Sequence, residues 1–162
     1  MSVDPGVWAQ WASVAERYGH GWARASDPDL GWLVEALEPR PSDRALDLGA
    51  GAGHAALAVV PHVVEVVATD PTPEMLAVAS RLAAERGLAN VRLVEATVDA
   101  LPFPAASFDL AFSHNSVHHW PYPLAGLREA PAGVRARLAI EANGSSFSVD
   151  AGLVVARLEA TP

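Results

Sequence analysis

The chain has 162 residues, the length of one domain with one substantial hydrophobic core. Its 19 acidic and 11 basic residues give a formal net charge of −8, so it lacks the basic surface that nucleic-acid binding requires. It contains no cysteine, which excludes disulfides and thiolate chemistry.

The first 38 residues predict two helices. Trp8, Trp11, Ala15, Tyr18 and Trp22 recur at steps of three and four residues and mark one apolar helical face. That face favours packing on a sheet for Trp8 and Trp11. A second helix is expected from about residue 30 to residue 37, before two prolines end it.

No secretory signal or membrane span is expected. The opening residues lack a basic start followed by an apolar segment, and the most apolar stretch, 55–68, is interrupted by Pro61, His62 and Glu65. We therefore expect a cytoplasmic protein.

The middle of the chain alternates predicted strands and helices. One helix follows the first strand and ends near Pro61. A second starts with Thr72 as N-cap and Pro73 in its first turn, and it ends at Gly87. This alternation predicts an α/β fold with a mostly parallel twisted sheet and helices on both faces. The expected strands are 44–48, 63–69, 91–94 and 108–113.

The tail predicts reduced C-terminal strands. Pro131 interrupts the helix expected around 124–130, and strands are expected at 137–141 and 152–158, the last with an antiparallel option. Residues 143–146 are turn-like.

The sequence Ala-Leu-Asp-Leu-Gly-Ala-Gly-Ala-Gly at 45–53 is the most informative motif. Glycines at 49, 51 and 53 allow a strand to turn sharply into a helix and let a ligand lie against bare backbone. A dinucleotide fingerprint requires G-x-G-x-x-G, but His54 occupies the sixth position, which argues against a nicotinamide oxidoreductase. Asp47 would repel a pyrophosphate and attract an ammonium group, so the motif favours an amino-acid-like ligand.

Further polar residues follow the other predicted strands, where ligands bind in open α/β sheets. Asp70 ends the second strand and can accept both hydroxyls of a ribose. Residues 97–99 follow the third strand, and residues 113–115 follow the fourth. Together these positions suit a ligand with an amino acid at one end and a nucleoside at the other.

Four motifs occur in order, and on them the chain resembles the class I S-adenosylmethionine-dependent methyltransferases, most closely the ubiquinone/menaquinone-biosynthesis-like group. Besides the glycine motif they are Ala-Thr-Asp-Pro-Thr-Pro-Glu-Met-Leu, Ala-Leu-Pro-Phe-Pro-Ala-Ala-Ser-Phe-Asp-Leu and Ser-Val-His-His-Trp-Pro. The resemblance covers roughly 18–128 and implies a Rossmann-like methyltransferase fold. It implies a single domain with an N-terminal helical lid (1–38), a cofactor-binding core (44–130) and shortened C-terminal strands (131–162).

The resemblance also implies S-adenosylmethionine as cofactor, with S-adenosylhomocysteine as product. The glycines would line the methionine portion, Asp70 would hold the ribose hydroxyls, and Asp47 would orient the amino group or the loop. Tyr18 would lie beside the cofactor and Met75 near the adenosine. The full set of implied cofactor contacts is Tyr18, Asp47, Gly49, Gly51, Gly53, Asp70, Pro71, Met75, Thr97, Val98 and Ser113.

The chain departs from this family in two places. Thr97 stands where the family commonly carries an acid facing the adenine amino group, and a neutral acceptor binds more weakly, so Asp99 is expected to compensate. After residue 129 the family usually continues into a glycine-rich turn and another strand. Here Ala130-Pro131-Ala132-Gly133 follows instead, and little room remains for the usual helix and strand pair.

Two functions follow from the resemblance. The first is methyl transfer to a small-molecule acceptor. The alternative is a non-catalytic protein or subunit that binds S-adenosylmethionine or S-adenosylhomocysteine and needs a partner chain. That alternative includes a homodimer formed over an incomplete sheet edge.

Methyl transfer from a sulfonium requires mainly alignment in a dry pocket, so a general base is optional. His118 and His114 are the weak candidates for such a base. Their spacing of four permits a metal site, but no supporting carboxylate or cysteine cluster accompanies them, so no metal is expected.

Overall fold

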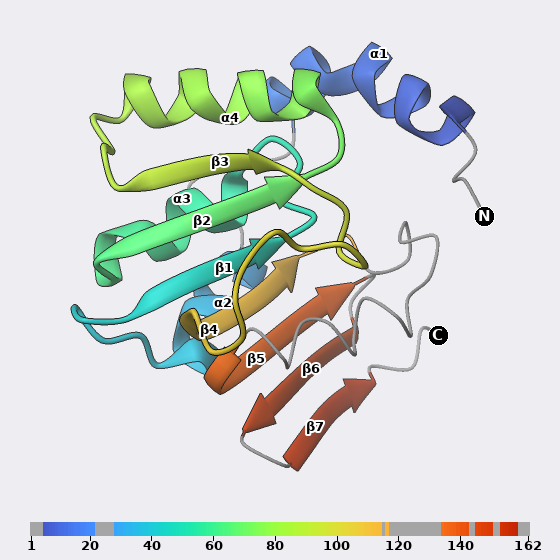
Figure 1. The fold of residues 1–162 in the computed structure, drawn as a ribbon. Helices are drawn as coiled ribbons and strands as arrows, with labels where there is room; N and C mark the ends of the chain where they lie inside the picture. The colour runs from blue at the N-terminus through green and yellow to red at the C-terminus, as the bar shows by residue number, and fades with distance from the viewer. Residues whose placement is uncertain are drawn as a thin grey trace.

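The computed structural model of the chain describes residues 5–21, 28–114, 116, 134–142, 145–150 and 153–158. Figure 1 shows a single twisted sheet with helices packed behind it and along its upper edge. The helices are α1 (Pro5–Gly21), α2 (Pro28–Leu37), α3 (His54–Val59), the 3-10 turn η1 (Val60–His62) and α4 (Pro73–Glu85). The strands are β1 (Arg44–Leu48), β2 (Glu65–Asp70), β3 (Val91–Glu95), β4 (Phe108–His114), β5 (Val134–Ala142), β6 (Ser145–Asp150) and β7 (Leu153–Leu158).

The sheet has the order β3-β2-β1-β4-β5-β6-β7. β3, β2, β1, β4 and β5 run parallel to one another, which confirms the predicted mostly parallel sheet. β6 and β7 each pair antiparallel with the strand before them. Ligand sites in α/β folds form at the carboxyl ends of parallel strands. In Figure 1 these ends, the arrowheads of β1 to β5, lie on the right, so a ligand site is expected there.

The C-terminal strands differ from the sequence prediction. Ser145 and Ser146 were expected in a turn, but they begin β6 and pair with Ala142 and Glu141 of β5. The residues between these strands are Asn143 and Gly144, a pair typical of two-residue hairpin turns, so the sequence did contain a signal for this hairpin. The sequence predicted reduced C-terminal strands. The strands β5, β6 and β7 are present, but the connections between them are short, with two residues between β5 and β6 and two between β6 and β7.

Side chains of β1 alternate between two apolar clusters. Ala45 packs with α2 and α3, while Leu46 and Leu48 pack on the opposite face with Phe108. Phe103, from the loop between β3 and β4, closes over that opposite face and contacts the edge of the Phe108 ring at 5.1 Å between centroids. The helix expected around residues 124–130 lies outside the described residues.

α1 docks on α4. Ala15 of α1 is buried, and a Cβ placed on Gly19 would lie 2.5 Å from Cγ1 of Val78, so the two helices approach closely. Arg81 of α4 donates to both carboxylate oxygens of Glu16, at 2.9 and 2.8 Å. Trp11 packs against the same apolar cluster, so its apolar face is used for packing, but against α4 rather than against the sheet as predicted. No described helix has the length and hydropathy needed to cross a membrane.

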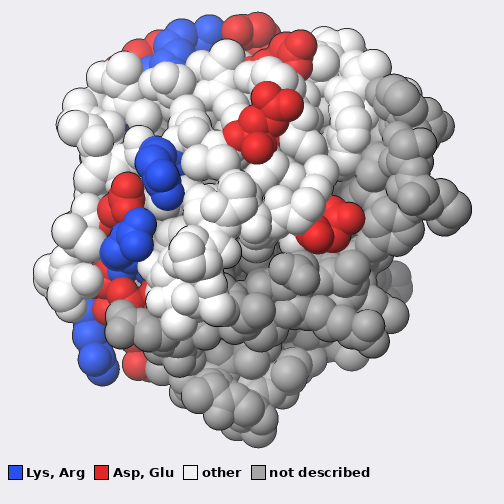
Figure 2. All heavy atoms as spheres, in the orientation of Figure 1, with Lys and Arg blue, Asp and Glu red and all other residues white. Residues whose placement is uncertain are grey.

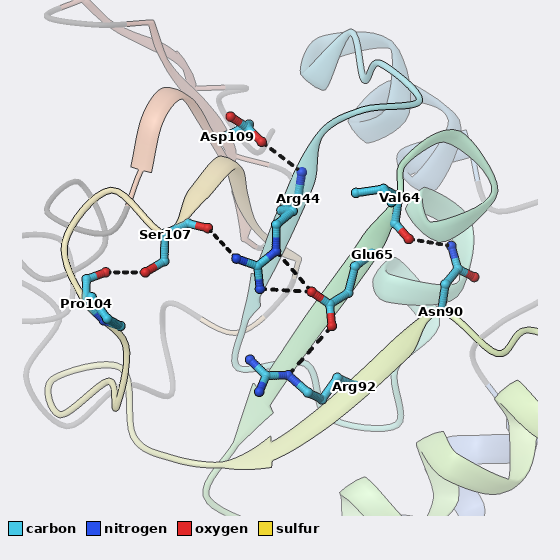
Figure 3. A network of polar contacts seen from close by, with 8 residues as sticks. All are labelled: Arg44, Val64, Glu65, Asn90, Arg92, Pro104, Ser107 and Asp109. Carbon is cyan, nitrogen blue, oxygen red and sulfur yellow. Dashed lines mark hydrogen bonds and ion pairs between the residues drawn. The ribbon is translucent and has the colours of Figure 1, made fainter.

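A polar network at the amino ends of the strands fixes the register of the central sheet (Figure 3). The Arg44 guanidinium donates to Glu65 at 2.9 and 3.1 Å and to the Ser107 carbonyl at 3.0 Å, and it lies 5.4 Å from the centre of the Phe108 ring. The Arg44 backbone N–H donates to Asp109 at 3.0 Å. This network joins β1, β2 and β4 at the end remote from the glycine motif.

Arg44→Ala is expected to lower the free energy of unfolding by about 1–2 kcal/mol, because several partners are lost although the side chain is 43 % exposed. Arg92→Ala is the matched control. Its ion pair with Glu65 is 3.8 Å long and its side chain is 52 % exposed, so a loss of at most ~0.5 kcal/mol is expected. Urea denaturation of both variants measures the difference, and equal losses would contradict a special role for Arg44.

Candidate functional site

The turn between β1 and α3 depends on its three glycines. Gly49, Gly51 and Gly53 have φ angles of 69°, 53° and 83°, in the left-handed region that favours glycine. The Ala50 N–H donates to the Thr69 carbonyl at 2.8 Å, which ties the turn to β2. The sharp strand-to-helix turn predicted from the sequence is confirmed.

The last two glycines face different surroundings. A Cβ on Gly53 would lie 2.8 Å from Cβ of Ala79, so Gly53 allows the turn to pack against α4. A Cβ on Gly51 would meet no atom of the described residues within 4 Å. Gly51 therefore lies on the open side of the turn, where a ligand can approach its backbone.

Asp70 connects the glycine turn to the start of α4. Its side chain is 8 % exposed; Oδ2 accepts the Gly51 N–H at 2.8 Å and Oδ1 accepts the Thr72 N–H at 2.9 Å. Burial raises the pKa of Asp70, and the hydrogen bonds from Gly51 and Thr72 partly offset that rise. Asp70 thus lies at the end of β2, as predicted, and directly beside Gly51.

The expected N-cap role of the Thr72 side chain is wrong. Thr72 has the extended backbone of an N-cap residue, but its hydroxyl makes no capping hydrogen bond. The backbone provides the cap instead: the Thr72 carbonyl accepts the Met75 and Leu76 N–H groups at 3.0 and 3.2 Å, while the Thr72 side chain helps to lower the pKa of Asp70.

Asp47 is the most unusual residue of the site. It is completely buried, and neither carboxylate oxygen has a hydrogen-bond partner among the described residues. Burial first and the negative charge of Asp70 second raise its pKa well above the ordinary value, while the nearby Ala56 N–H lowers it slightly without a hydrogen bond of good geometry. Such an unsatisfied carboxyl fits a cationic group, and the ammonium of a bound amino acid would supply one.

The segment after β3 lies next to Asp70, at the carboxyl ends of the strands. The Ala96 N–H donates to the Asp70 carbonyl at 3.3 Å, and the Ala100 N–H closes a turn on the Thr97 carbonyl at 3.1 Å. Val98 is buried in that turn and packs with the apolar cluster under β1. Thr97 is half-buried.

Ser113 of β4 takes part in a buried pair of hydrogen bonds near the end of β1. Its hydroxyl is fully buried and lies 2.6 Å from the Ser116 hydroxyl, which in turn donates to the Leu48 carbonyl at 2.9 Å. Sequence reasoning quoted Ser116 as the first residue of the Ser-Val-His-His-Trp-Pro motif but assigned it no role. These two hydrogen bonds connect Ser116 to Ser113 of β4 and to the end of β1.

The remaining expected site residues are placed as follows. Met75 is 2 % exposed and packs in the cluster between α1 and α4, Pro71 is half-buried, and His114 is half-buried at the end of β4. His118 and the Tyr18 side chain lie outside the described residues. In the described part of the chain no three His, Cys, Asp or Glu side chains form a group that could hold a metal ion.

Basic and acidic side chains of the described residues are distributed unevenly over the face shown in Figure 2. In Figure 2 the blue side chains lie mainly where the strands begin and along the top, and two acidic groups lie nearer the carboxyl ends. The acidic side chains of the candidate site itself are the buried Asp47 and Asp70, which suit a ligand carrying positive charge.

Comparison with known proteins identifies the family. A model of the methyltransferase domain matches residues 46–134. The uncharacterized methyltransferase YcgJ of Bacillus subtilis is 43 % identical over 115 residues, which cover 71 % of this chain and 46 % of that protein. The demethylmenaquinone methyltransferase of Thermus thermophilus is 49 % identical over 87 residues, or 50 % of this chain and 39 % of that enzyme.

Solved structures agree. The YcgJ crystal structure matches with a TM-score of 0.68 and 39 % identity, over 70 % of this chain and 49 % of that chain. A putative S-adenosyl-L-methionine-dependent methyltransferase from Methanococcus maripaludis matches with a TM-score of 0.72 over 89 % of this chain and 68 % of that chain. At 17 % identity, it supports the fold alone. The chain spans less than half the length of the curated relatives described above.

Proposed function

Because the chain belongs to the methyltransferase domain family, among the class I S-adenosylmethionine-dependent methyltransferases, we propose that it transfers a methyl group from S-adenosylmethionine to a small-molecule acceptor. The observation that carries the proposal is the buried carboxyl of Asp47, which has no hydrogen-bond partner among the described residues and precedes a glycine turn that Asp70 holds through Gly51. A dinucleotide would bring a pyrophosphate toward two carboxylates, which disfavours the oxidoreductase alternative.

In this proposal the site binds the cofactor by its two ends. Asp47 receives the amino group or fixes the glycine turn, and the Gly51 backbone lies against the methionine portion. Asp70 accepts the ribose hydroxyls with lone pairs left free by its two backbone hydrogen bonds. Val98, Pro71, Thr97 and Met75 then line or support the adenosine side.

When bound, S-adenosylmethionine supplies a methyl group activated by a positively charged sulfur, and its transfer is an in-line displacement. The task of the chain is to hold the donor in one orientation and to exclude water. The buried Ser113–Ser116 relay contributes rigidity on the β4 side. His118 and His114 stay the candidates to accept a proton when the acceptor atom carries one, and of the two only His114, at the end of β4, lies within the described residues.

The proposed acceptor is a quinone-like or other apolar ring. Support comes from the demethylmenaquinone methyltransferase relative and from the tryptophan-rich first segment. We include the division into an N-terminal lid (1–38), a core (44–130) and C-terminal strands (131–162) in this proposal.

Calorimetric titration with S-adenosylmethionine and S-adenosylhomocysteine tests the cofactor assignment. Wild type should bind both saturably, and Asp70→Ala should weaken binding at least ~100-fold, because the ribose acceptor and the hydrogen bond to Gly51 are both lost. Glu74→Ala, an exposed acid of α4, is the matched control and should leave affinity unchanged. A folded wild-type protein that binds neither ligand would refute the proposal.

A further inference from the structure

An apolar groove runs beside the open edge of β3. β3 is the outermost strand on its side of the sheet, at the opposite end from β7, and among the described strands only β2 pairs with it. Figure 1 shows α4 lying along this strand. Ser80 and Ala84 of α4 line the groove between helix and strand, together with Leu88, Val91 and Leu93. Val91 and Leu93 are only half-buried there, so an unpaired strand edge and an apolar surface lie open together.

The backbone of β3 directs alternate residues toward β2 and toward the outer edge. The Asn90 carbonyl accepts an N–H of β2 at 3.0 Å, and the Ala96 N–H donates to a β2 carbonyl at 3.3 Å. The even-numbered residues of this segment therefore face β2. Val91, Leu93 and Glu95 direct one N–H and one C=O each toward the outer edge, where a further strand can pair with them.

Antiparallel pairing of β3 with a second copy of itself satisfies these groups in one register. If Leu93 lies opposite its own copy on a two-fold axis, Val91 lies opposite Glu95, and each opposed pair exchanges two hydrogen bonds. Every outward N–H and C=O of the three residues is then paired. Any other centre leaves at least one of the three opposite a residue outside the strand, and a centre at Arg92 would also oppose two arginines.

The same two-fold axis brings unlike charges together. Arg86 is the C-cap of α4, where the chain turns toward β3, and Glu95 ends β3; both side chains are exposed. In this register Glu95 of the second copy lies opposite Val91, on the side of Arg86, and the contact occurs twice. Both α4 helices lie on the same face of the joined sheet, where the small exposed side chains of Ser80 and Ala84 permit close approach.

We propose that this chain forms a two-fold dimer in which β3 pairs antiparallel with β3 of a second copy, centred on Leu93. The two sheets become one, and the two grooves close on each other. The inference is independent of the proposed function. It also differs from a dimer over the shortened C-terminal strands, which would use the β7 edge. The carboxyl ends of the parallel strands in the two copies point in opposite directions, so both candidate sites stay open.

Sedimentation velocity tests the dimer. Wild type should sediment as a dimer with a Kd of about 10 μM or tighter. Ala84→Arg places a long charged side chain in the groove and should weaken association at least ~100-fold, while its exposed position spares the fold of the monomer. Ala105→Arg is the matched control, because it makes the same substitution at an exposed alanine that does not line the groove, and it should leave the dimer intact.

Single cysteines measure the register, because the chain contains none of its own. Leu93→Cys places two thiols opposite each other with about 5.5 Å between the Cα atoms, a distance that a disulfide spans. Mild oxidation with copper–phenanthroline should therefore cross-link most of this variant as a dimer. In Arg92→Cys each thiol lies opposite Val94 of the second copy, so this control should stay largely without a cross-link.

Three results would each overturn the proposal. The first is a wild-type protein that is monomeric at about 100 μM. The second is a dimer that Ala84→Arg leaves intact. The third is a dimer in which Arg92→Cys cross-links as readily as Leu93→Cys. None of these measurements uses S-adenosylmethionine, so failure of the dimer and failure of the proposed function are distinguishable.

Discussion

Asp47→Asn is expected to weaken S-adenosylmethionine binding by about 10- to 100-fold while leaving the free protein as stable as wild type, or more stable, at neutral pH. The amide keeps the shape of the carboxyl but cannot ionise to receive an ammonium group. In the free protein it also removes the cost of burying a carboxyl whose two oxygens lack partners. Calorimetry and urea denaturation measure the two effects.

The pH dependence of stability provides a second readout. The folded state raises the pKa of Asp47 well above its ordinary value of 3.8, so the folded chain holds the proton more tightly than the unfolded chain. As pH rises from about 3.8 through the folded-state pKa, the free energy of unfolding therefore falls. The pKa of Asp70 shifts in the same direction and remains in the variant, so the stability gain from Asp47→Asn, rather than the total slope, should grow with pH.

Cofactor binding should reverse this protonation. An ammonium group beside Asp47 favours the ionised carboxylate, so affinity should rise with pH over the same interval and binding should release about one proton. Titrations in two buffers of different ionisation enthalpy count that proton. A large loss of stability in Asp47→Asn with unchanged affinity would instead assign Asp47 to support of the glycine turn.

Local signals predicted most of the parallel core. The sequence Thr72-Pro73-Glu74 marked the start of α4, and Gly87 marked its end because the chain there needs a positive φ of 65°. β2 begins at Glu65 rather than at Val63. The Val64 N–H bonds the Asp43 carbonyl outside the sheet, and Glu65 pairs with Arg44 across β1. These two contacts join residues 21 positions apart, so apolar content alone placed the boundary too early.

The candidate site shows the same division between local and long-range information. The glycine pattern and the position of Asp70 at a strand end follow from neighbouring residues. The isolation of Asp47 and the Ser116 contact with Leu48 depend on tertiary packing, since the second joins residues 68 positions apart. Sequence reasoning singled out Asp47 and Asp70, but not that of these two only Asp70 has hydrogen-bond partners among the described residues.

Two of the three glycines at the turn, Gly53 and Gly51, should separate stability from binding when each is replaced by alanine. Gly53→Ala places a methyl group 2.8 Å from Cβ of the buried Ala79, in a backbone conformation that L-residues disfavour. It should lower the free energy of unfolding by about 2–4 kcal/mol, the sum of left-handed strain and overpacking.

Gly51→Ala carries similar backbone strain but meets no atom of the described part of the chain within 4 Å, so its cost in stability should be only about 1–2 kcal/mol. Its methyl group would instead occupy the open side of the turn and should weaken S-adenosylhomocysteine binding by at least ~10-fold, because the ligand can no longer approach the backbone. Urea denaturation and calorimetry on both variants measure this contrast. Wild-type affinity in a folded Gly51→Ala protein would mean that the ligand does not lie against this turn, whereas the expected contrast would mean that Gly51 is required by the ligand and Gly53 by the fold.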